Sequence, residues 1–381
     1  MAAGRRTRIL IVDDSAVMRS LLRSVVSTDA ALEVAGTAAD GASALNLLGT
    51  LRPDLLLLDV EMPVMDGLVT LRQLRARGHK MPVIMCSSLT QRGAQVTIEA
   101  LACGASDYVA KPAGQSGREA ATRLLSKDLI PKIHALAGLP SSSPFHAAFP
   151  ARAPFVRPPL MMPAAPLFKP QPMSSNPAVL VIGVSTGGPV ALDQLLPMLP
   201  AGFPLPVLIV QHMPELFTRL FAERLNGRCP LAVGEAVEGS PVRPGTIHIA
   251  RGNWHLEVMA AAHAGSAPTL HLSQGAPENH CRPAVDVLFR SAASVYGPGV
   301  LAVVLTGMGS DGAAGCRIIR NQGGSVLAQD QASSAVWGMP GAVANAGLAH
   351  KVLPLSAIAP EILRIAGQSC GEARALRERV G

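Results

Sequence analysis

The sequence predicts two α/β domains with parallel sheets, joined by a proline-rich linker. Apolar runs alternate with amphipathic stretches up to about residue 137, and the same alternation resumes after residue 176, a pattern typical of parallel sheets covered by helices. The segment between them, residues 138–176, holds ten prolines and no acidic residue, which is typical of an extended linker. Because 381 residues exceed one ordinary hydrophobic core, we expect domains at residues 1–137 and 177–381, separated by this linker.

Five apolar runs in the first domain predict the strands of a doubly wound (βα)5 fold. The predicted strands are residues 9–12, 32–35, 54–60, 82–87 and 107–110. Ser15 is a suitable N-cap for a helix over residues 16–26, and Gly78 and Gly104 are placed to end helices. A last helix is predicted over residues 118–137, directly before the linker.

Six further apolar runs predict a second α/β domain. Its predicted strands are residues 178–184, 207–211, 246–250, 269–272, 300–305 and 325–328. Its predicted helices are residues 191–199, 216–225, 284–293 and 312–321. We expect antiparallel additions to its parallel sheet around residues 246–258 and 269–273.

Composition and charge exclude several classes of protein. The longest apolar stretches, such as residues 178–184 and 300–305, are far shorter than the roughly 20 residues that span a bilayer, and the N-terminus has no signal-peptide pattern. We therefore expect a cytoplasmic protein without membrane insertion. We also expect a monomer. The net charge of +7 divides into +3 before the linker, +3 in it and +1 after it, so no concentrated basic patch indicates nucleic-acid binding.

Six scattered cysteines form no CxxC pair, which argues against disulfides and zinc.

Polar residues follow four strands of the first domain. Asp13 and Asp14 come after the first strand, Asp59 ends the third, Ser87 ends the fourth, and Lys111 follows the fifth. The carboxyl ends of parallel strands meet at one edge of a sheet, so we expect these side chains to converge there. Three close carboxylates repel one another and need a divalent cation, and all-oxygen ligation favours Mg²⁺.

The first domain resembles the receiver domains of two-component response regulators over about residues 7–137. The matching motifs are residues 9–15, the segment DVEMPVMDG from Asp59, Ser87, and the segment YVAKP from Tyr108. This resemblance implies that Asp59 accepts a phosphoryl group from a histidine kinase. It also implies Mg²⁺ ligands at Asp13, Asp14, Asp59 and the Glu61 carbonyl, and switch residues at Ser87, Tyr108 and Lys111.

A glycine-rich turn after the first strand of the second domain contains the segment GVSTG, residues 183–187, which matches G-x-S-x-G. Such a turn suits an oxyanion hole or a phosphate cradle, but a Walker lysine is absent. His212 and Asp311 also follow strands, so Ser185, His212 and Asp311 are expected at one sheet edge. Their order along the chain excludes the α/β-hydrolase family without excluding a triad.

The second domain is similar to the catalytic domain of chemotaxis protein-glutamate methylesterases. The matching segments are VIGVSTGGP, VQHMP, ENHCRPAVDVLF, VVLTGMGSDGAAG and GMPGAV. The resemblance implies hydrolysis of glutamyl methyl esters on chemoreceptors, glutamine deamidation, and no cofactor for the esterase. Its implied residues are Ser185 as nucleophile, His212 as base, Asp311 as orienting carboxylate, Thr186, Gly187 and Met308 around the oxyanion, and Arg282 as a receptor contact.

Two other functions fit parts of the sequence. A receiver joined to a non-catalytic binding module remains an alternative, although all three triad residues are present. A receiver-linked transcription factor would need a compact basic output domain with a recognition helix. The strand-rich, near-neutral second domain argues against it.

Overall fold

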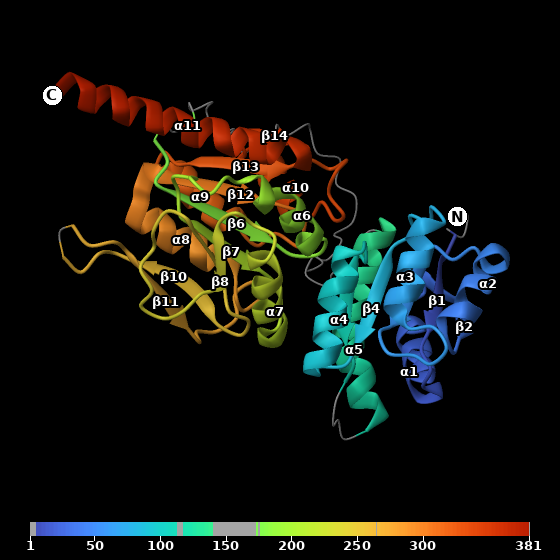
Figure 1. The fold of residues 1–381 in the computed structure, drawn as a ribbon. Helices are drawn as coiled ribbons and strands as arrows, with labels where there is room; N and C mark the ends of the chain where they lie inside the picture. The colour runs from blue at the N-terminus through green and yellow to red at the C-terminus, as the bar shows by residue number, and fades with distance from the viewer. Residues whose placement is uncertain (1–4, 113–116, 140–172, 174–175, 264, 381) are drawn as a thin grey trace, which may run out of the picture.

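The computed structural model describes residues 5–112, 117–139, 173, 176–263 and 265–380, and it contains two α/β domains (Figure 1). Nearly all of the predicted linker therefore lies outside the described residues. No helix in the described part of the chain is long and apolar enough to cross a membrane.

The first domain is a parallel five-stranded sheet in the order β2-β1-β3-β4-β5. The strands are β1 Thr7–Val12, β2 Leu32–Ala38, β3 Leu55–Asp59, β4 Val83–Ser87 and β5 Asp107–Ala110. The helices are α1 Ala16–Val26, α2 Gly41–Leu51, α3 Gly67–Ala76, α4 Gln91–Ala102 and α5 Arg118–Ala137. This is the predicted doubly wound fold.

Local sequence signals explain where several of these helices begin and end. The Ser15 side chain accepts a hydrogen bond from the backbone N–H of Met18, as expected of the α1 N-cap. Gly78 and Gly104 adopt φ of 80° and 99° just after α3 and α4, so the chain leaves each helix at the predicted glycine.

The second domain has a parallel seven-stranded sheet in the order β14-β13-β12-β6-β7-β9-β8 and a separate antiparallel pair, β10-β11. The strands are β6 Val179–Val184, β7 Val207–Gln211, β8 Ala232–Glu235, β9 Thr246–Ile249, β10 His255–Met259, β11 Thr269–Ser273, β12 Val300–Val304, β13 Ser325–Gln329 and β14 Lys351–Leu353. The helices are α6 Gly188–Leu195, η1 Leu196–Met198, α7 Glu215–Asn226, α8 Val285–Tyr296, η2 Gly297–Gly299, α9 Ala313–Asn321, α10 Met339–Asn345 and α11 Leu355–Val380.

The structure corrects three expectations for this domain. The antiparallel addition is right for β10 and β11 but wrong for β9, which pairs in parallel with β7 and β8, because residues 236–245 carry the chain back to the start of the sheet. Strands β8 and β14 went unpredicted because they are short, partly exposed edge strands without an apolar run. Helix α6 begins at Gly188, three residues before the prediction, because Gly187 is left-handed and Pro189 suits the first turn.

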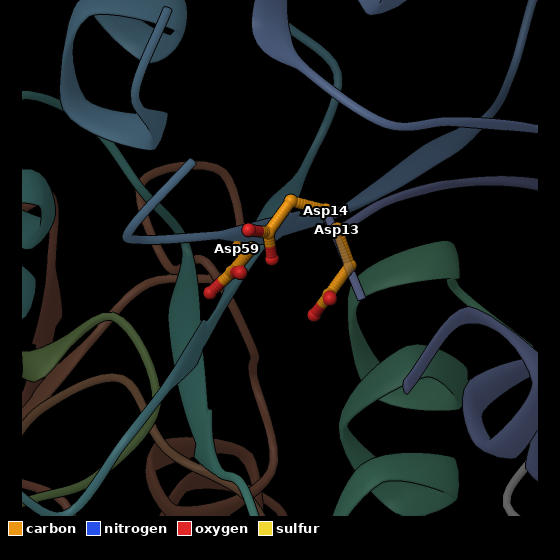
Figure 2. Close-up of side chains that lie close together, drawn as sticks. All are labelled: Asp13, Asp14 and Asp59. Atoms are coloured by element: carbon orange, nitrogen blue, oxygen red, sulfur yellow. The ribbon is translucent and has the colours of Figure 1, made fainter. Parts of the chain in front are cut away.

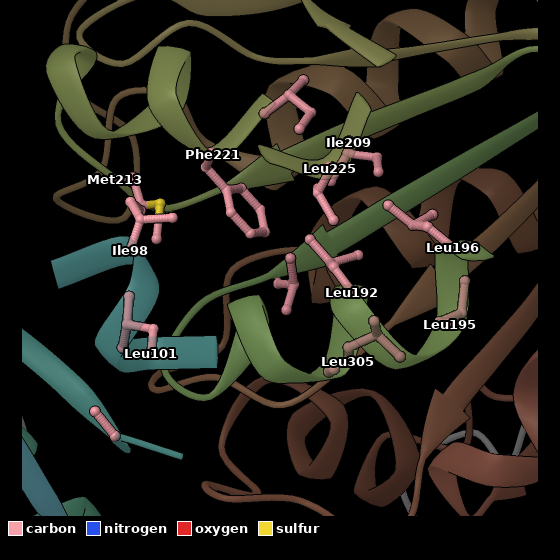
Figure 3. Packing of buried hydrophobic residues seen from close by; sticks show 14 of the residues in the cluster. Ile98, Leu101, Leu192, Leu195, Leu196, Ile209, Met213, Phe221, Leu225 and Leu305 are labelled. Atoms are coloured by element: carbon pink, nitrogen blue, oxygen red, sulfur yellow. The ribbon is translucent and has the colours of Figure 1, made fainter. Parts of the chain in front are cut away.

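The two domains pack directly against each other through α4, which lies against α6 and α7. Figure 3 shows Ile98 and Leu101 of α4 near Met213, Phe221 and Leu192 of the second domain, all members of one cluster of buried hydrophobic side chains. The apolar face of α4 therefore packs into the hydrophobic core of the second domain. This packing places the receiver next to the functional site described below.

Candidate functional site

The predicted acidic cluster forms at the carboxyl ends of β1 and β3. Carboxylate oxygens of Asp13, Asp14 and Asp59 lie within 4.8 Å of one another (Figure 2). Asp13 and Asp59 are buried, whereas Asp14 is exposed. A group of three oxygen donors open to solvent on one side suits Mg²⁺, which keeps several water ligands.

Lys111 links the two buried carboxylates. Its Nζ lies 2.7 Å from Asp59 Oδ1 and 2.8 Å from Asp13 Oδ2. Burial raises the pKa of Asp59 to about 6, and Lys111 opposes part of that rise. Burial alone would lower the pKa of Lys111, but its hydrogen bonds to the two carboxylates raise it. The lysine is therefore a cation fixed beside the Asp59 carboxylate.

The two predicted switch residues occupy different surroundings. Ser87 is fully buried at the end of β4, and its carbonyl accepts a hydrogen bond from the backbone N–H of Lys111 at 2.7 Å. Tyr108 lies at the domain interface, where its ring stacks on Phe217 of α7 with centroids 4.4 Å apart. Its carbonyl accepts a hydrogen bond from Lys132 at 2.7 Å. The switch tyrosine is thus in contact with the second domain.

Ser185, His212 and Asp311 follow three neighbouring strands of the second sheet. Ser185 comes directly after β6, His212 directly after β7, and Asp311 lies in the loop between β12 and α9. In the sheet β6 lies between β12 and β7, so the order of the strands brings the three loops together. The chain crosses from one side of β6 to the other here, the place where α/β sheets form clefts.

His212 and Asp311 are joined by a hydrogen bond of 2.9 Å between Nε2 and Oδ2. The other ring nitrogen of His212, Nδ1, lies 3.6 Å from Cys281 Sγ. Burial alone would lower the pKa of His212, but the hydrogen bonds with Asp311 and Cys281 raise it to about 9. Asp311 therefore stabilises the imidazolium. In the neutral ring Nδ1 is the nitrogen that can accept a proton, and it faces the Cys281 thiol.

Asp311 is held by several donors besides His212. Its oxygens accept backbone N–H groups of Val285 at 2.7 Å and Asp286 at 3.0 Å, at the start of α8. The Asn279 amide also donates to Asp311, at 2.9 Å. Burial alone would raise the pKa of Asp311, but the hydrogen bond and charge of His212, together with the backbone N–H groups of Val285 and Asp286, lower it. Asp311 is therefore a fixed, ionised partner for the histidine.

The Ser185 turn depends on two glycines. Gly187 adopts a φ of 78°, a conformation that side chains other than glycine rarely tolerate. A Cβ on Gly307 would lie 2.8 Å from Ser185 Cβ and 2.5 Å from Met339 Sδ. The loop after β12 can therefore lie this close to Ser185 only because position 307 is glycine. The Ser185 carbonyl accepts a hydrogen bond from the Gln211 side chain at 3.0 Å.

A cavity of about 800 Å³ lies at this edge, and both domains line it. Ser185, His212 and Met308 contribute from the second domain, and Tyr108 and Lys132 contribute from the receiver. A direct hydrogen bond crosses the interface beside the serine: Thr186 Oγ1 donates to Asp107 Oδ2 at 2.6 Å. Thr186, predicted near the oxyanion, is thus tied to the receiver in this structure.

Arg282 lines the same cavity. Its guanidinium donates to Asn253 Oδ1 at 2.7 Å and to the carbonyls of Gln274 and Gly275 at 3.2 and 2.8 Å. All three acceptors are neutral, so these hydrogen bonds fix the side chain without neutralising its charge.

Several residues at the site were absent from the sequence-based prediction. Asn279 and Cys281 lie in the quoted segment ENHCRPAVD, but nothing in that segment shows that they contact Asp311 and His212. Asp107 and Phe217 contribute only through the domain interface, for which the sequence carries no local signal.

Known proteins match both domains. Residues 180–362 match the family model described as CheB methylesterase, and residues 9–122 match that of the response regulator receiver domain. The crystal structure of the Thermotoga maritima CheB methylesterase catalytic domain is similar to 50% of this chain and 99% of that chain, with 40% sequence identity and a TM-score of 0.48.

Curated relatives match almost the whole chain. A protein-glutamate methylesterase/protein-glutamine glutaminase from Nocardioides sp. is 52% identical over 94% of this chain and 94% of its own. One of the same name from Trichodesmium erythraeum is 47% identical over 94% of this chain and 99% of its own. The chain therefore belongs to the CheB family, in which a response regulator receiver domain accompanies a protein-glutamate methylesterase.

Proposed function

We propose that this enzyme hydrolyses glutamyl methyl esters of chemoreceptors with Ser185 as nucleophile, His212 as general base and Asp311 as orienting carboxylate. The observation that carries the proposal is the hydrogen bond between His212 and Asp311, made beside the Ser185 turn in one cavity. A Ser-His-Asp triad is defined by the roles of its residues, so the different order along this chain is compatible with the proposal.

The proposed reaction proceeds in two halves. Ser185 Oγ attacks the ester carbonyl while Nδ1 of His212 takes the hydroxyl proton, for which the serine hydroxyl has to replace the Cys281 thiol at that nitrogen. His212 then returns the proton to the departing methoxide, so methanol leaves and a glutamyl acyl-enzyme remains. Water, deprotonated by His212, cleaves the acyl-enzyme to free glutamate and Ser185.

The residues around the serine supply charge stabilisation and substrate contact. Backbone N–H groups of Thr186, Gly187 and Met308 are the proposed donors to the tetrahedral oxyanion, supported by their position on the loops that flank Ser185. Arg282, whose charge is unneutralised by its hydrogen bonds, is the proposed contact for acidic side chains of the receptor.

Glutamine deamidation is a second proposed activity of the same site. The names of the relatives include protein-glutamine glutaminase. A primary amide passes through the same acyl-enzyme if His212 protonates ammonia as it leaves, so no additional residue is required. Ammonia release from receptors that carry the unmodified glutamines is the direct measurement.

The receiver domain is proposed to accept a phosphoryl group on Asp59 from the chemotaxis histidine kinase. Asp13, Asp14 and Asp59 fit a Mg²⁺ ion by donor type and spacing, and the Glu61 carbonyl is the further proposed ligand. The ion would supply charge neutralisation for the transferred phosphoryl group. Lys111, fixed between Asp13 and Asp59, would contact the oxygens of the phosphoryl group. We place the reaction in the cytoplasm.

We also propose that the unphosphorylated receiver inhibits the esterase by covering it. The cavity of about 800 Å³ is large enough for a glutamyl side chain, but a receptor helix is about 10–12 Å in diameter and would be blocked by the packed domains. Ser87 and Tyr108 would relay phosphorylation to the interface, where Tyr108 stacks on Phe217. Opening a site that is 99% closed needs roughly 5 kcal/mol of differential stability.

The triad is tested by methanol release from receptor membranes carrying radiolabelled methyl esters, with acetyl phosphate and Mg²⁺ present. Ser185→Ala should release no methanol, because the alanine methyl group cannot form the acyl-enzyme. Ser266→Ala, in the loop between β10 and β11, is the matched control and should behave as the parent. Undiminished release by Ser185→Ala would exclude the triad.

A further inference from the structure

A tight turn between β11 and α8 presents one residue to the catalytic carboxylate. Its central residues, Asn279 and His280, have φ of 51° and 63°. Glu278 and Cys281 exchange both backbone hydrogen bonds across it, at 3.0 and 2.8 Å. Positive φ at both central positions is typical of a type I′ turn, which favours Asn. Arg290 of α8 holds the Glu278 carboxylate by two hydrogen bonds of 2.6 and 2.7 Å, so the turn is anchored to that helix.

The Asn279 amide connects two buried carboxylates. Its Nδ2 donates one hydrogen bond to Asp311 Oδ1 at 2.9 Å and another to Asp286 Oδ2 at 3.0 Å. Asp311 and Asp286 are only 2% and 3% exposed. Burial raises the pKa of Asp286, and the nearby charge of Asp311 raises it further. Two carboxylates so close need a hydrogen-bond donor between them, and one amide group serves both.

Asn279 also separates these carboxylates from the cavity. The residue is exposed and lines the cavity next to Ser185 and His212. From the other side Asp286 accepts the backbone N–H of Gly315 at 2.6 Å, so its second oxygen is held within the protein. Asn279 is therefore the one side chain among the described residues that donates to both carboxylates from the cavity side.

We propose that Asn279 is a positioning residue of the esterase, which keeps the Asp311 carboxylate oriented toward His212 and apart from the charge of Asp286. The inference rests on the proposed triad. It assigns a function to the Asn279 side chain that is separate from the conformation of the turn, since glycine and aspartate also tolerate positive φ.

Three variants of the full-length chain, Asn279→Gly, Asn279→Asp and Asn279→Ala, separate the positioning of Asp311 by the amide from the shaping of the turn. Asn279→Gly keeps the backbone conformation but removes the donor, and Asn279→Asp keeps the shape but replaces the donor with a third carboxylate. If the amide positions Asp311, kcat should fall roughly 10- to 100-fold in Asn279→Gly, the range of a hydrogen bond to a charged group, and further in Asn279→Asp, with little change in KM. His280→Asn, in the same turn, is the matched control.

The pH profile of kcat/KM provides a readout that a structural role would not change. The added carboxylate of Asn279→Asp favours the imidazolium, so the acid limb set by His212 should move to higher pH. If Asn279 only shapes the turn, Gly and Asp should both match the parent and Asn279→Ala alone should lose activity, which would overturn the proposal. Ser185→Ala in the same assay distinguishes this outcome from failure of the triad, since its full activity would refute the triad itself.

Discussion

At the scale of single residues, both candidate sites contain a buried carboxylate that is held by hydrogen bonds and an ion pair. Lys111 lies between Asp13 and Asp59, and Asp311 lies between His212 and the first turn of α8. Hydrogen-bond donors outweigh burial at Asp311, whose pKa is lowered, but only partly offset burial at Asp59, whose pKa is raised to about 6. The reactions proposed for the two sites also differ: phosphoryl acceptance at Asp59 and proton transfer at His212.

The pKa of His212 gives a prediction for Asp311→Asn. With Asp311 ionised the pKa of the imidazole is raised to about 9, and the neutral base becomes available only as the pH rises toward that value. Asparagine removes the charge, so the acid limb of kcat/KM should move to lower pH while kcat falls by roughly 10⁴-fold. The NMR titration of the His212 ring measures the same change independently of turnover. An unchanged titration would show that Asp311 does not control His212.

Asp59 gives a second prediction at this scale. With Mg²⁺, acetyl phosphate should phosphorylate Asp59 of the parent chain, and beryllofluoride should bind to the same carboxylate. Neither should modify Asp59→Ala. Intact mass measures the phosphoryl group, and ¹⁹F NMR measures the bound beryllofluoride. Chelation of Mg²⁺ should also prevent loading, because the carboxylate cluster repels a dianion without the ion. Phosphorylation of Asp59→Ala would place the acceptor at another residue.

At the scale of elements, α4 makes the apolar contact between the domains. Ile98 is 4% exposed and belongs to the same buried cluster as Met213 and Phe221 of the second domain (Figure 3). The helix thus presents its apolar side to α6 and α7. The contact is suited to regulation because α4 connects to the receiver sheet next to Ser87 at the end of β4.

Ile98→Glu should therefore raise the basal esterase activity of the unphosphorylated chain. A buried carboxylate without a partner costs several kcal/mol, comparable with the roughly 5 kcal/mol needed to open a site that is 99% closed, so the closed arrangement should lose most of its population. Methanol release without phosphodonor measures the effect. Val17→Glu, at a position of α1 that is 78% exposed, is the matched control. Equal basal rates for the two variants would show that α4 does not hold the site closed.

At the scale of the whole molecule, two functional edges are combined in one chain. Asp107 of the receiver accepts a hydrogen bond from Thr186, and Tyr108 of the receiver stacks on Phe217. Both domains line the cavity next to Ser185. Because one chain carries both domains, the proposed closure would need only a modest interface. The proposed inhibition would therefore depend on the packing of the two domains.

A fragment of residues 176–381 should show higher basal activity than the unphosphorylated full chain and no response to phosphodonor. The fragment lacks the receiver that covers the cavity, so receptor helices reach Ser185 directly. Methanol release on the same receptor membranes compares the two proteins, and circular dichroism checks that the fragment is folded. Equal basal rates would favour activation by recruitment to the receptor over inhibition by the receiver.

The sequence by itself determined the two α/β domains, and it placed Asp59, Ser185 and His212 at strand ends. These features follow from local patterns, because apolar runs define strands and the carboxyl ends of parallel strands meet at one edge. Only the tertiary structure decided that Nε2 of His212 faces Asp311, that Asn279 joins Asp311 to Asp286, and that receiver residues line the cavity. Those contacts join side chains distant along the chain, and their formation depends on strand order, on an anchored turn and on the packing of one domain against the other, none of which has a local signature in the sequence.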